Sequence, residues 1–381
     1  MAIVAVLAVV TYVLTRDVYR AVTVMIVFCP CAFILATPTA VVAAIGNLTK
    51  HGILVKDGDS LERMASVDIV AFDKTGTVTL GRPEIVEVHS VMDEDELIRL
   101  AASAESGSMH PLAKAFADRS SDLDIRTSRP ESFRTVPGSG VKAVVEGRIV
   151  LIGNSRMMKE HGIVVPNEAE ALLGRMAEDG KTAVIVAIDD AYSGIVALSD
   201  TIRDASAETV SELMGMGVDS LLLTGDNGRI AEIVASEIGI RDVRAGCTPM
   251  SKVEAIEDMQ GLGRKVCMIG DGVNDAPALR KAWVGISMGA TGSDIASDAA
   301  DMVLVKDGIE SIPHLVSLSR RMMSKVRMNI AFSMCWNLTA VALSMLAILG
   351  PVTGALVHNV GSVVVVVNSA VLLIYGKRSK T

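Results

Sequence analysis

Long apolar stretches at both ends of the chain constrain its fold more than any other feature. They occupy residues 2–14, 21–46, 330–350 and 352–375. Because about 20 helical residues cross a bilayer core, the last three are long enough to span it and the first is borderline. Short turns join the stretches in pairs. This arrangement predicts two membrane-embedded helical hairpins on either side of one long polar region.

Composition supports a chain that lies partly in lipid. Half of the residues are hydrophobic, which is unusual for a soluble enzyme. The net charge is −8 and aromatic residues make up only 3% of the chain, so no basic or base-stacking surface for nucleic acid is expected. The five cysteines are scattered and odd in number, which favours a reducing compartment.

Basic residues predict how the chain is oriented in the bilayer. They flank the polar region and end the chain, at Lys50, Lys56, Arg320, Arg321, Lys325, Arg327, Lys377, Arg378 and Lys380. Cytoplasmic segments next to membrane helices carry such an excess of Lys and Arg. We therefore expect an integral protein of a prokaryotic plasma membrane, with the lipid bilayer as a partner and the polar region in the cytoplasm.

The polar region is predicted to be one α/β domain interrupted by another. Continuous apolar runs at residues 69–72, 220–223, 265–269 and 284–288 are typical of buried parallel strands. Residues 81–197 instead alternate strands with tight turns, which predicts an inserted α+β domain with antiparallel strands. The expected division is a membrane hairpin over 1–46, an α/β domain in two parts over 47–80 and 198–328, the insert over 81–197, and a second membrane hairpin over 329–376.

Asp73 stands directly after the first buried run. That position lies at the carboxyl edge of a sheet, where open α/β sheets bind ligands. A carboxylate there can attack a phosphoryl group and form an acyl phosphate. The crowded negative charge requires a divalent cation such as Mg²⁺, which is held by carboxylates and phosphate oxygens.

Two further strand ends supply matching groups. Gly270-Asp271-Gly272-Val273-Asn274-Asp275 follows one run, and Thr224-Gly225-Asp226 follows another. Asp271 and Asp275 are candidates for holding or surrounding the metal, and Lys252 can bring positive charge to the phosphoryl oxygens. The predicted catalytic residues are Asp73, Lys74, Thr75, Thr224, Gly225, Asp226, Lys252, Asn274 and Asp275.

The order DKTGT, TGD and GDGVND resembles the signatures of P-type ATPases, within the haloacid dehalogenase superfamily. The resemblance implies a haloacid dehalogenase-like Rossmannoid phosphorylation domain with an inserted nucleotide-binding domain. It also implies that ATP phosphorylates Asp73, that Asp73, Thr75 and Asp271 hold Mg²⁺, and that Asp200 and Arg203 form the hinge that leaves the insert.

Residues in the insert are similar to the adenine site of the heavy-metal branch of that family. Glu105-Ser106-Gly107-Ser108-Met109-His110-Pro111 matches the adenine motif, and Gly138-Ser139-Gly140 matches the glycine loop. His110 is predicted to stack on or hydrogen-bond with adenine, with helix capping as the alternative. The implied nucleotide-binding residues are Glu105, His110, Pro111, Gly138, Gly140, Gly153 and Asn154.

Cys29-Pro30-Cys31 lies in the middle of a predicted span, where polar groups are costly and indicate function. On an intact helix, thiols two residues apart would point to different sides. Pro30 lacks an N–H, so we expect the helix to open and both sulfurs to face one cavity. Thiolates favour Cu(I), Zn²⁺ and Cd²⁺ over Mg²⁺ and Ca²⁺. The alternative is a pair of small buried side chains beside a packing kink.

Polar residues in the last two spans are candidate ligands for the same ion. They are Asn337, His358, Asn359 and Ser362. His358 has an alternative as an interfacial residue near the outer surface. Copper exporters of the family carry a Tyr-Asn pair and Met with paired serines, and zinc exporters carry an acidic residue in the last span; neither pattern fits fully. Imidazole suits Zn²⁺ better than Cu(I), so we favour a divalent transition metal, with Cu(I) as the alternative.

The family's Thr-Gly-Glu actuator motif does not occur in the chain. We therefore expect that a separate or missing actuator segment is needed as a partner, and that this polypeptide cannot complete transport alone. Two other functions compete with an ATP-driven metal pump. One is a membrane-tethered phosphatase of the same superfamily, and the other is a metal-binding or regulatory fragment that does not transport.

Overall fold

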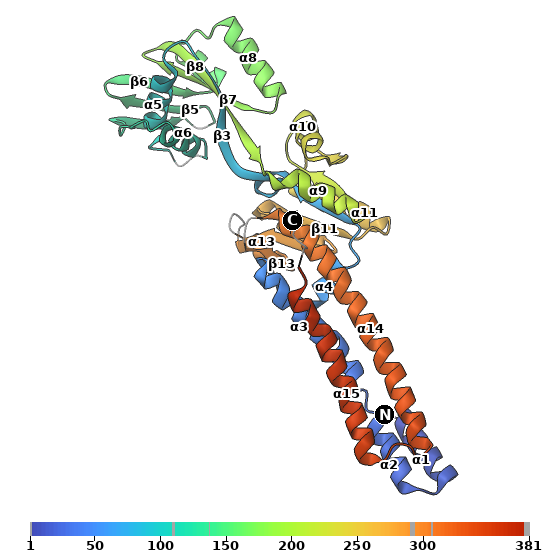
Figure 1. Cartoon of the computed structure of the whole chain (residues 1–381). Helices are drawn as coiled ribbons and strands as arrows, with labels where there is room; N and C mark the ends of the chain where they lie inside the picture. The colour runs from blue at the N-terminus through green and yellow to red at the C-terminus, as the bar shows by residue number, and fades with distance from the viewer. Residues whose placement is uncertain (1, 109–110, 137, 290–293, 306–307, 377–381) are drawn as a thin grey trace.

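The computed structural model describes residues 2–108, 111–136, 138–289, 294–305 and 308–376. Helices form an elongated stalk at one end of the molecule (Figure 1). A seven-stranded sheet follows the stalk, and a six-stranded sheet lies at the far end. The described chain therefore separates into a helical part and two sheet-containing parts.

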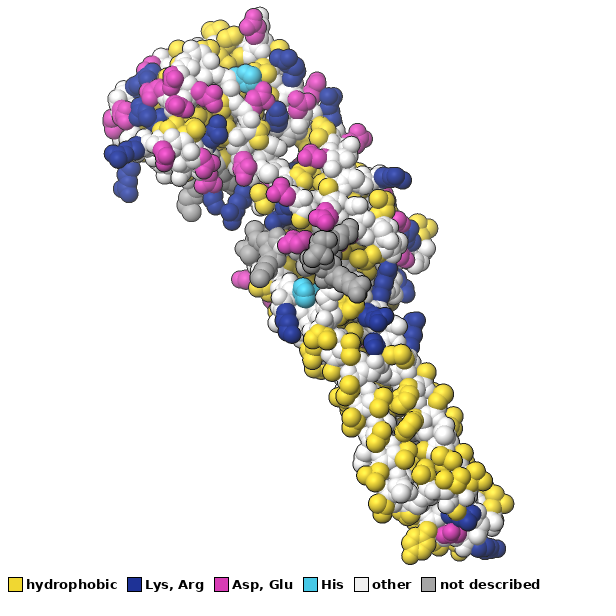
Figure 2. Space-filling model, in the orientation of Figure 1, with side chains coloured by type: hydrophobic (Ala, Val, Ile, Leu, Met, Phe, Trp, Pro, Cys, Tyr) yellow, Lys and Arg dark blue, Asp and Glu magenta, His cyan; other side chains and the backbone are white. Residues whose placement is uncertain are grey.

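The stalk contains α1 (Ala2–Thr15), α2 (Val18–Val27), α3 (Cys31–Lys50), α14 (Ile312–Met345) and α15 (Pro351–Ala370). Three described segments are long and apolar enough to cross a membrane, namely Val18–Lys50, Ile309–Met345 and Pro351–Ile374, whereas α1 is short. Hydrophobic side chains cover the outside of the stalk (Figure 2). The predicted membrane hairpins are confirmed, and the chain is an integral membrane protein.

The seven-stranded sheet consists of β1 (Ile53–Val55), β2 (Ile69–Asp73), β9 (Asp219–Leu223), β10 (Asp242–Arg244), β11 (Val266–Gly270), β12 (Val284–Met288) and β13 (Met302–Leu304). Its order is β1-β13-β12-β11-β2-β9-β10, and only β1 runs antiparallel to its neighbour. The four strands predicted from apolar runs are confirmed as β2, β9, β11 and β12. They are adjacent and parallel, so their carboxyl ends share one edge.

Side-chain alternation along the strands builds two hydrophobic layers on this sheet. Val70 and Phe72 of β2 pack in one layer, whereas Ile69 and Ala71 pack in the other. The first layer is covered by α4 (Gly58–Met64), α9 (Ala205–Gly215), α10 (Gly228–Ile238) and the start of α14. The second is covered by α11 (Pro249–Gly261), α12 (Ala276–Lys281) and α13 (Asp294–Ala299). Because strands buried on both faces need apolar residues at every position, the runs are continuous.

Local sequence signals set the ends of α10 and α11, the helices that follow β9 and β10. Asn227 begins α10 by accepting a hydrogen bond from the Ile230 N–H, and Gly239 ends it with a φ of 81°. Thr248 begins α11 in the same way, accepting from the Ser251 N–H, with Pro249 in the first turn. These N-caps fix the residue at which each helix begins, and therefore the length of the turn between strand and helix at the edge of the sheet.

The six-stranded sheet is antiparallel in the order β3-β8-β7-β6-β5-β4, formed by β3 (Thr79–Ser90), β4 (Ser132–Val136), β5 (Gly140–Val145), β6 (Arg148–Gly153), β7 (Thr182–Ile188) and β8 (Ala191–Ile202). The helices α5 (Glu94–Glu105), α6 (Pro111–Asp122), α7 (Ser155–Glu160) and α8 (Asn167–Glu178) accompany it. Tight turns join β5 to β6 and β7 to β8, as the alternation of strands and turns in this region predicts. Glu146, Gly147, Asp189 and Asp190 all have positive φ, as a tight two-residue turn requires.

The predicted domain boundaries fall inside continuous elements. The boundary at 328/329 lies within α14, which runs unbroken from the seven-stranded sheet into the stalk. The boundaries at 80/81 and 197/198 lie within β3 and β8, the paired strands that connect the two sheets. The hydropathy of α14 changes where the helix passes from the seven-stranded sheet into the apolar stalk. The helix itself continues through this point, so a change in hydropathy does not mark the end of an element.

Asn47 connects three stalk segments where the stalk meets the seven-stranded sheet. Its amide donates hydrogen bonds to the Leu372 and Tyr375 carbonyls, at 2.9 and 2.5 Å, and its Oδ1 lies 2.9 Å from His314 Nε2. Asn47 is buried, so these bonds satisfy groups that water does not reach. The side chain therefore ties α3 to α14 and to the segment after α15.

We predict that Asn47→Ala lowers the free energy of unfolding by about 2 kcal/mol, because two buried partners, Leu372 and His314, and the half-buried Tyr375 lose their hydrogen bonds. Denaturant unfolding of the chain in detergent measures the change. Thr49→Ala is the control, since the exposed Thr49 hydroxyl bonds only to the Ile45 carbonyl within the same helix. Equal stability of the two variants would contradict the proposed contribution of Asn47.

Candidate functional site

Asp73 is the last residue of β2, the strand between β9 and β11. Its side chain is 6% exposed. The adjacent β11 ends at Gly270, just before Asp271, and β9 ends at Leu223, just before Thr224. Parallel pairing thus brings three separate sequence motifs to one edge of the sheet, as the sequence predicted.

The turn after Asp73 requires a glycine. Gly76 has a φ of 72°, and a Cβ atom placed there would lie 1.8 Å from Asp271 Oδ2. No other residue accommodates both the left-handed backbone and this close approach. Gly76 therefore allows the turn that carries Thr75 to pack directly against the Asp271 carboxylate.

Lys252 of α11 joins the two carboxylates that flank it. Its Nζ contacts Asp73 Oδ1 and lies 2.7 Å from Asp275 Oδ1. Burial lowers the pKa of Lys252, but the charges of Asp73 and Asp275 outweigh that effect and raise the pKa overall. The ammonium therefore stays charged where phosphoryl oxygens would need a positive partner.

Three carboxylates gather around this lysine. Asp73, Asp271 and Asp275 each offer an oxygen within 4.8 Å of the others. Burial, followed by repulsion from Asp275, raises the pKa of Asp73 to about 7, and the same two causes raise the pKa of Asp271 to about 6. A single lysine does not balance three carboxylates, of which Asp73 and Asp275 are buried and Asp271 is half-buried, so the cluster fits a divalent cation with oxygen ligands.

A cavity of about 320 Å³ opens over the cluster. Its lining includes nine of the residues singled out by sequence: Asp73, Thr75, Thr224, Gly225, Asp226, Lys252, Asp271, Asn274 and Asp275. Lys74 does not line the cavity but forms an ion pair with Asp226. Cys247, Pro249 and Gly272 also line it. Nothing local in the sequence places Cys247 beside the strand ends, so sequence patterns alone do not identify it as part of this lining.

The residues predicted as a hinge lie where β8 leaves the six-stranded sheet. Arg203 Nε donates to the Thr77 and Thr79 carbonyls at 2.9 and 3.0 Å, and Asp200 Oδ2 accepts from the Thr79 hydroxyl at 2.5 Å. Both side chains thus hold the backbone just beyond the Asp73 turn. This contact links the orientation of the second sheet to the catalytic edge.

A second cavity, of about 300 Å³, lies on the six-stranded sheet. Its lining includes five of the predicted nucleotide residues: Glu105, Gly138, Gly140, Gly153 and Asn154. His110 lies outside the described residues, and Pro111 begins α6. A Cβ atom on Gly140 would lie 2.0 Å from the Ile152 carbonyl oxygen, so this strand contact needs glycine.

Glu105 is the buried acid of the second cavity. Burial raises its pKa, and its Oε2 has no hydrogen-bond partner among the described residues. An orphaned buried acceptor fits a ligand that brings an N–H or amino group, as adenine does. Arg156, which sequence reasoning missed, donates from Nη2 to the Gly138 carbonyl at 2.8 Å and supports the glycine loop.

The stalk helix opens at Pro30, as expected. α2 ends at Val27 and α3 begins at Cys31, so residues 28–30 separate the two helices. Cys29 and Cys31 turn to the same side, with Cα atoms 5.6 Å apart, and the structure joins them as a disulfide where the sequence predicted free thiols. Opening the helix removes the angular separation that would have kept the sulfurs apart, so both bonding and shared metal ligation become possible.

The residues predicted to complete the ion site divide into two groups. His358 of α15 is brought to Cys29 and Cys31, with one ligand atom from each within 4.8 Å of the others, and its Nδ1 has no hydrogen-bond partner among the described residues. Asn337 contacts the backbone of this site: its side-chain amide donates a hydrogen bond to the Cys29 carbonyl at 3.3 Å. Ser362 donates to the His358 carbonyl, and Asn359 is exposed on the stalk.

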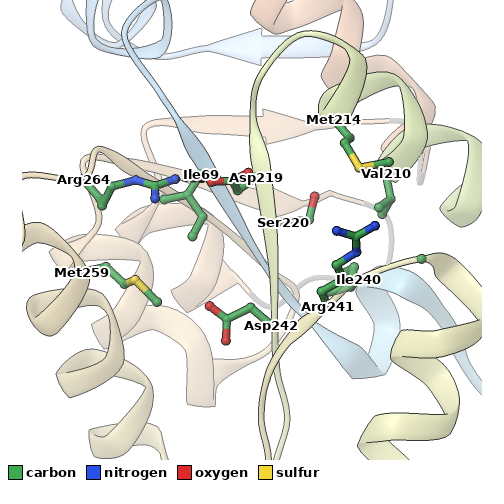
Figure 3. Close-up of a pocket in the computed structure, with 11 residues that line it drawn as sticks. Ile69, Val210, Met214, Asp219, Ser220, Ile240, Arg241, Asp242, Met259 and Arg264 are labelled. Atoms are coloured by element: carbon green, nitrogen blue, oxygen red, sulfur yellow. Dashed lines mark hydrogen bonds and ion pairs between the residues drawn. The ribbon is translucent and has the colours of Figure 1, made fainter.

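A third cavity, of about 240 Å³, lies at the opposite, amino edge of the seven-stranded sheet (Figure 3). Arg264 and Asp219 line it and form an ion pair at 2.5 Å. None of the predicted site residues is part of its lining. The residues with predicted chemistry therefore gather at the carboxyl edge, where a parallel sheet presents its strand-end turns.

Comparison with known proteins gives the family. Residues 67–282 match the haloacid dehalogenase-like hydrolase family. The chain is 37% identical over 370 residues to a zinc-exporting P-type ATPase of Mycobacterium marinum, covering 96% of this chain and 50% of that protein. It is 39% identical over 344 residues to the copper-transporting ATPase RAN1 of Arabidopsis thaliana, covering 85% of this chain and 34% of that protein.

A solved structure agrees with these sequence matches. The crystal structure of a zinc-transporting PIB-type ATPase in the E2.Pi state superimposes with a TM-score of 0.84 and 33% identity, covering 98% of this chain and 61% of the other. The chain thus spans about half the length, or somewhat more, of the zinc proteins it matches. It belongs to the haloacid dehalogenase-like hydrolases and, within them, to the heavy-metal P-type ATPases.

Proposed function

We propose that the chain is the catalytic and membrane portion of a pump that uses ATP to export a transition-metal ion through an aspartyl phosphate. The observation that carries this proposal is the position of Asp73, buried against Lys252 beside two further carboxylates. A nucleophile, a fixed cation and a cluster suited to Mg²⁺ are the groups that phosphoryl transfer to a carboxylate requires.

In the proposed reaction, an Asp73 carboxylate oxygen attacks the γ-phosphorus of ATP. A bond forms between that oxygen and phosphorus while the bond from phosphorus to the β-phosphate oxygen breaks, and ADP leaves. Lys252 offsets negative charge on the transferring group from a position that burial and two carboxylates already fix. Asp73, Thr75 and Asp271 would hold Mg²⁺, which neutralises charge when bound.

ATP would be held by the insert, which we propose as the nucleotide-binding domain over residues 81–197. Glu105 and the Gly138–Gly140 loop line one cavity, which supports an adenine site there. The contacts of Arg203 and Asp200 with the Asp73 turn support a hinge that delivers the γ-phosphate to the catalytic edge. A transfer between two separate cavities requires such a movement.

Cys29, Cys31 and His358 are proposed as ligands of the transported ion. Two thiolates and one imidazole form a borderline donor set that suits Zn²⁺, Cd²⁺ or Co²⁺, whereas Cu(I) favours sulfur more strongly. The disulfide must be reduced before the sulfurs can bind metal. Asn337 is proposed to support the opened helix through the Cys29 carbonyl, and Asn359, which is exposed, is not part of the proposed ligand set.

Transport is favoured over a membrane-tethered phosphatase by α14. This helix continues without a break from the catalytic sheet to Asn337 beside the Cys29 carbonyl. A movement of the sheet is therefore passed along one rigid helix to the proposed ion site. A tether would need neither this continuity nor a sulfur–imidazole cluster inside the stalk.

We predict that Asp73→Asn abolishes labelling of the protein by [γ-³²P]ATP, because the amide nitrogen and oxygen are poor nucleophiles. The unsubstituted chain should give a label that is stable in acid and released by hydroxylamine, as an acyl phosphate is. Asp242→Asn, at the opposite edge of the sheet, is the matched control and should label normally. Undiminished, hydroxylamine-sensitive labelling of Asp73→Asn would exclude Asp73 as the phosphorylated residue.

Mg²⁺ binding to the metal-free chain should tighten roughly tenfold between pH 6 and pH 8, because the raised pKa values of Asp73 and Asp271 make the ion displace protons at the lower pH. Both carboxylates are ionised at pH 8, and at pH 6 Asp73 is mostly protonated. Calorimetric titration in buffers of different ionisation enthalpy measures the affinity and the protons released. An affinity that does not change with pH would contradict the proposed cluster.

The metal is tested by adding Cu(I), Zn²⁺, Cd²⁺, Mn²⁺ and Co²⁺ in turn to the reduced, detergent-solubilised chain. We predict that one Zn²⁺ or Co²⁺ binds per chain and that Cys29→Ser, Cys31→Ser or His358→Gln weakens binding at least tenfold, because each removes a ligand. Cobalt absorption reports thiolate ligation directly. Cys335→Ser, an exposed stalk thiol, is the control. Tight Cu(I) binding that survives His358→Gln would instead support a copper exporter.

A further inference from the structure

Basic side chains gather where the apolar stalk meets the seven-stranded sheet (Figure 2). On α14 they are Arg320, Arg321, Lys325 and Arg327, and the apolar run begins at Ile330. At 1.5 Å per helical residue, Arg327 lies about 4.5 Å outside the start of this run. The polar headgroup layer occupies several ångströms at each side of the hydrocarbon core, so Arg327 is at the depth of the lipid phosphates.

A cavity of about 320 Å³ opens at this depth between the end of α4 and one face of α14. Its lining consists of Glu62, Ala65, Ser66, Arg320, Met323, Ser324 and Arg327. The residues from α14 are spaced three and four apart, so they form a single stripe along the helix. Arg321 and Lys325 belong to other faces and do not line the cavity.

The charged groups of the cavity differ in how they are held. Arg320 donates to the Met216 carbonyl at 2.8 Å and to the Val67 carbonyl at 3.3 Å, so it fixes the wall of the cavity. Arg327 is exposed and, among the residues that the structure describes, forms neither an ion pair nor a side-chain hydrogen bond. Glu62 likewise has no ion-pair partner within the described part of the chain. Of the three charged side chains in the lining, Arg320 is held by backbone carbonyls, and one cation, Arg327, and one anion, Glu62, thus face the same space without pairing with each other.

We propose that this cavity binds the headgroup of a membrane phospholipid of the ethanolamine class. The phosphodiester pairs with the Arg327 guanidinium and accepts from the Ser324 hydroxyl, and the ammonium donates to the Glu62 carboxylate. A free cation beside a free anion at headgroup depth matches a zwitterion that carries both charges a few ångströms apart. Choline cannot donate a hydrogen bond to Glu62, and an anionic headgroup would leave Glu62 opposed to a like charge or without a partner.

The inference does not depend on the proposed pump activity. The position between α4, which packs on the seven-stranded sheet, and α14, which enters the membrane, means that a bound lipid contacts both parts at once. Such a lipid would stabilise their relative orientation. Its effect is measurable as lipid retention in the chain without nucleotide or transported metal.

Native mass spectrometry tests the proposal on the full chain in detergent with an equimolar mixture of phosphatidylethanolamine, phosphatidylcholine and phosphatidylglycerol of identical acyl chains. We expect retention of the ethanolamine lipid to exceed that of the choline lipid at least fivefold. Arg327→Gln should reduce that retention about fivefold, Arg327→Lys should restore most of it, and Glu62→Gln should remove the preference for ethanolamine over choline. Excess inorganic phosphate should not displace the lipid, because the acyl chains add binding that free phosphate lacks.

Arg321→Gln is the matched control. It removes the same charge from the same helix, but Arg321 does not line the cavity. Its lipid retention should equal that of the unsubstituted chain. Equal losses in Arg321→Gln and Arg327→Gln would overturn the proposal in favour of diffuse attraction by the basic residues. Equal retention of ethanolamine and choline lipids, or a preference for phosphatidylglycerol, would also overturn it. Arg327 is exposed and has no ion pair or side-chain hydrogen bond to the described residues, so its replacement is not expected to unfold the chain.

Discussion

The crowding of Asp73, Asp271 and Asp275 around Lys252 is the interaction on which the rest of the structure depends. Crowding three carboxylates, two buried and one half-buried, around one ammonium is unfavourable, and the raised pKa values of Asp73 and Asp271 express that cost. The arrangement persists because it lies at the edge of a sheet whose strands are buried on both faces and are held by two hydrophobic layers. The stability of the core thus maintains a site that is ready for a cation and a phosphoryl group.

Two connections extend the influence of this edge to other parts of the chain. Arg203 and Asp200 hold the backbone beyond the Asp73 turn, which links the six-stranded sheet to the catalytic cluster. On the other side, α14 runs from the seven-stranded sheet into the stalk, and the Asn47 hydrogen bonds tie α14 to α3 and to the segment after α15. The chain therefore has a continuous mechanical path from the cavity on the six-stranded sheet to the opened helix at Pro30.

Sequence motifs predicted the catalytic edge well because each motif is local. Asp73, Thr224 and Asp271 directly follow apolar runs, and parallel strands necessarily end at a common edge. The contributions of Cys247 and Arg156 were missed because they arise from loop paths that no short pattern records. Asn337 and Asn359 looked equivalent as candidate ligands, yet one contacts the opened helix and the other is exposed, since their helical phase relative to Cys29 depends on packing.

Hydropathy and strand-end motifs by themselves determined that the chain has membrane hairpins, a parallel sheet and acidic motifs at one edge of that sheet, because burial on both faces and bilayer thickness leave a direct imprint on residue order. Only the tertiary structure decided that His358 meets Cys29 and Cys31, that the two sulfurs are joined, and that α14 crosses from sheet to stalk without interruption. These features depend on how separate helices rotate against one another. Such rotations are fixed by long-range packing, which one-dimensional periodicity does not contain.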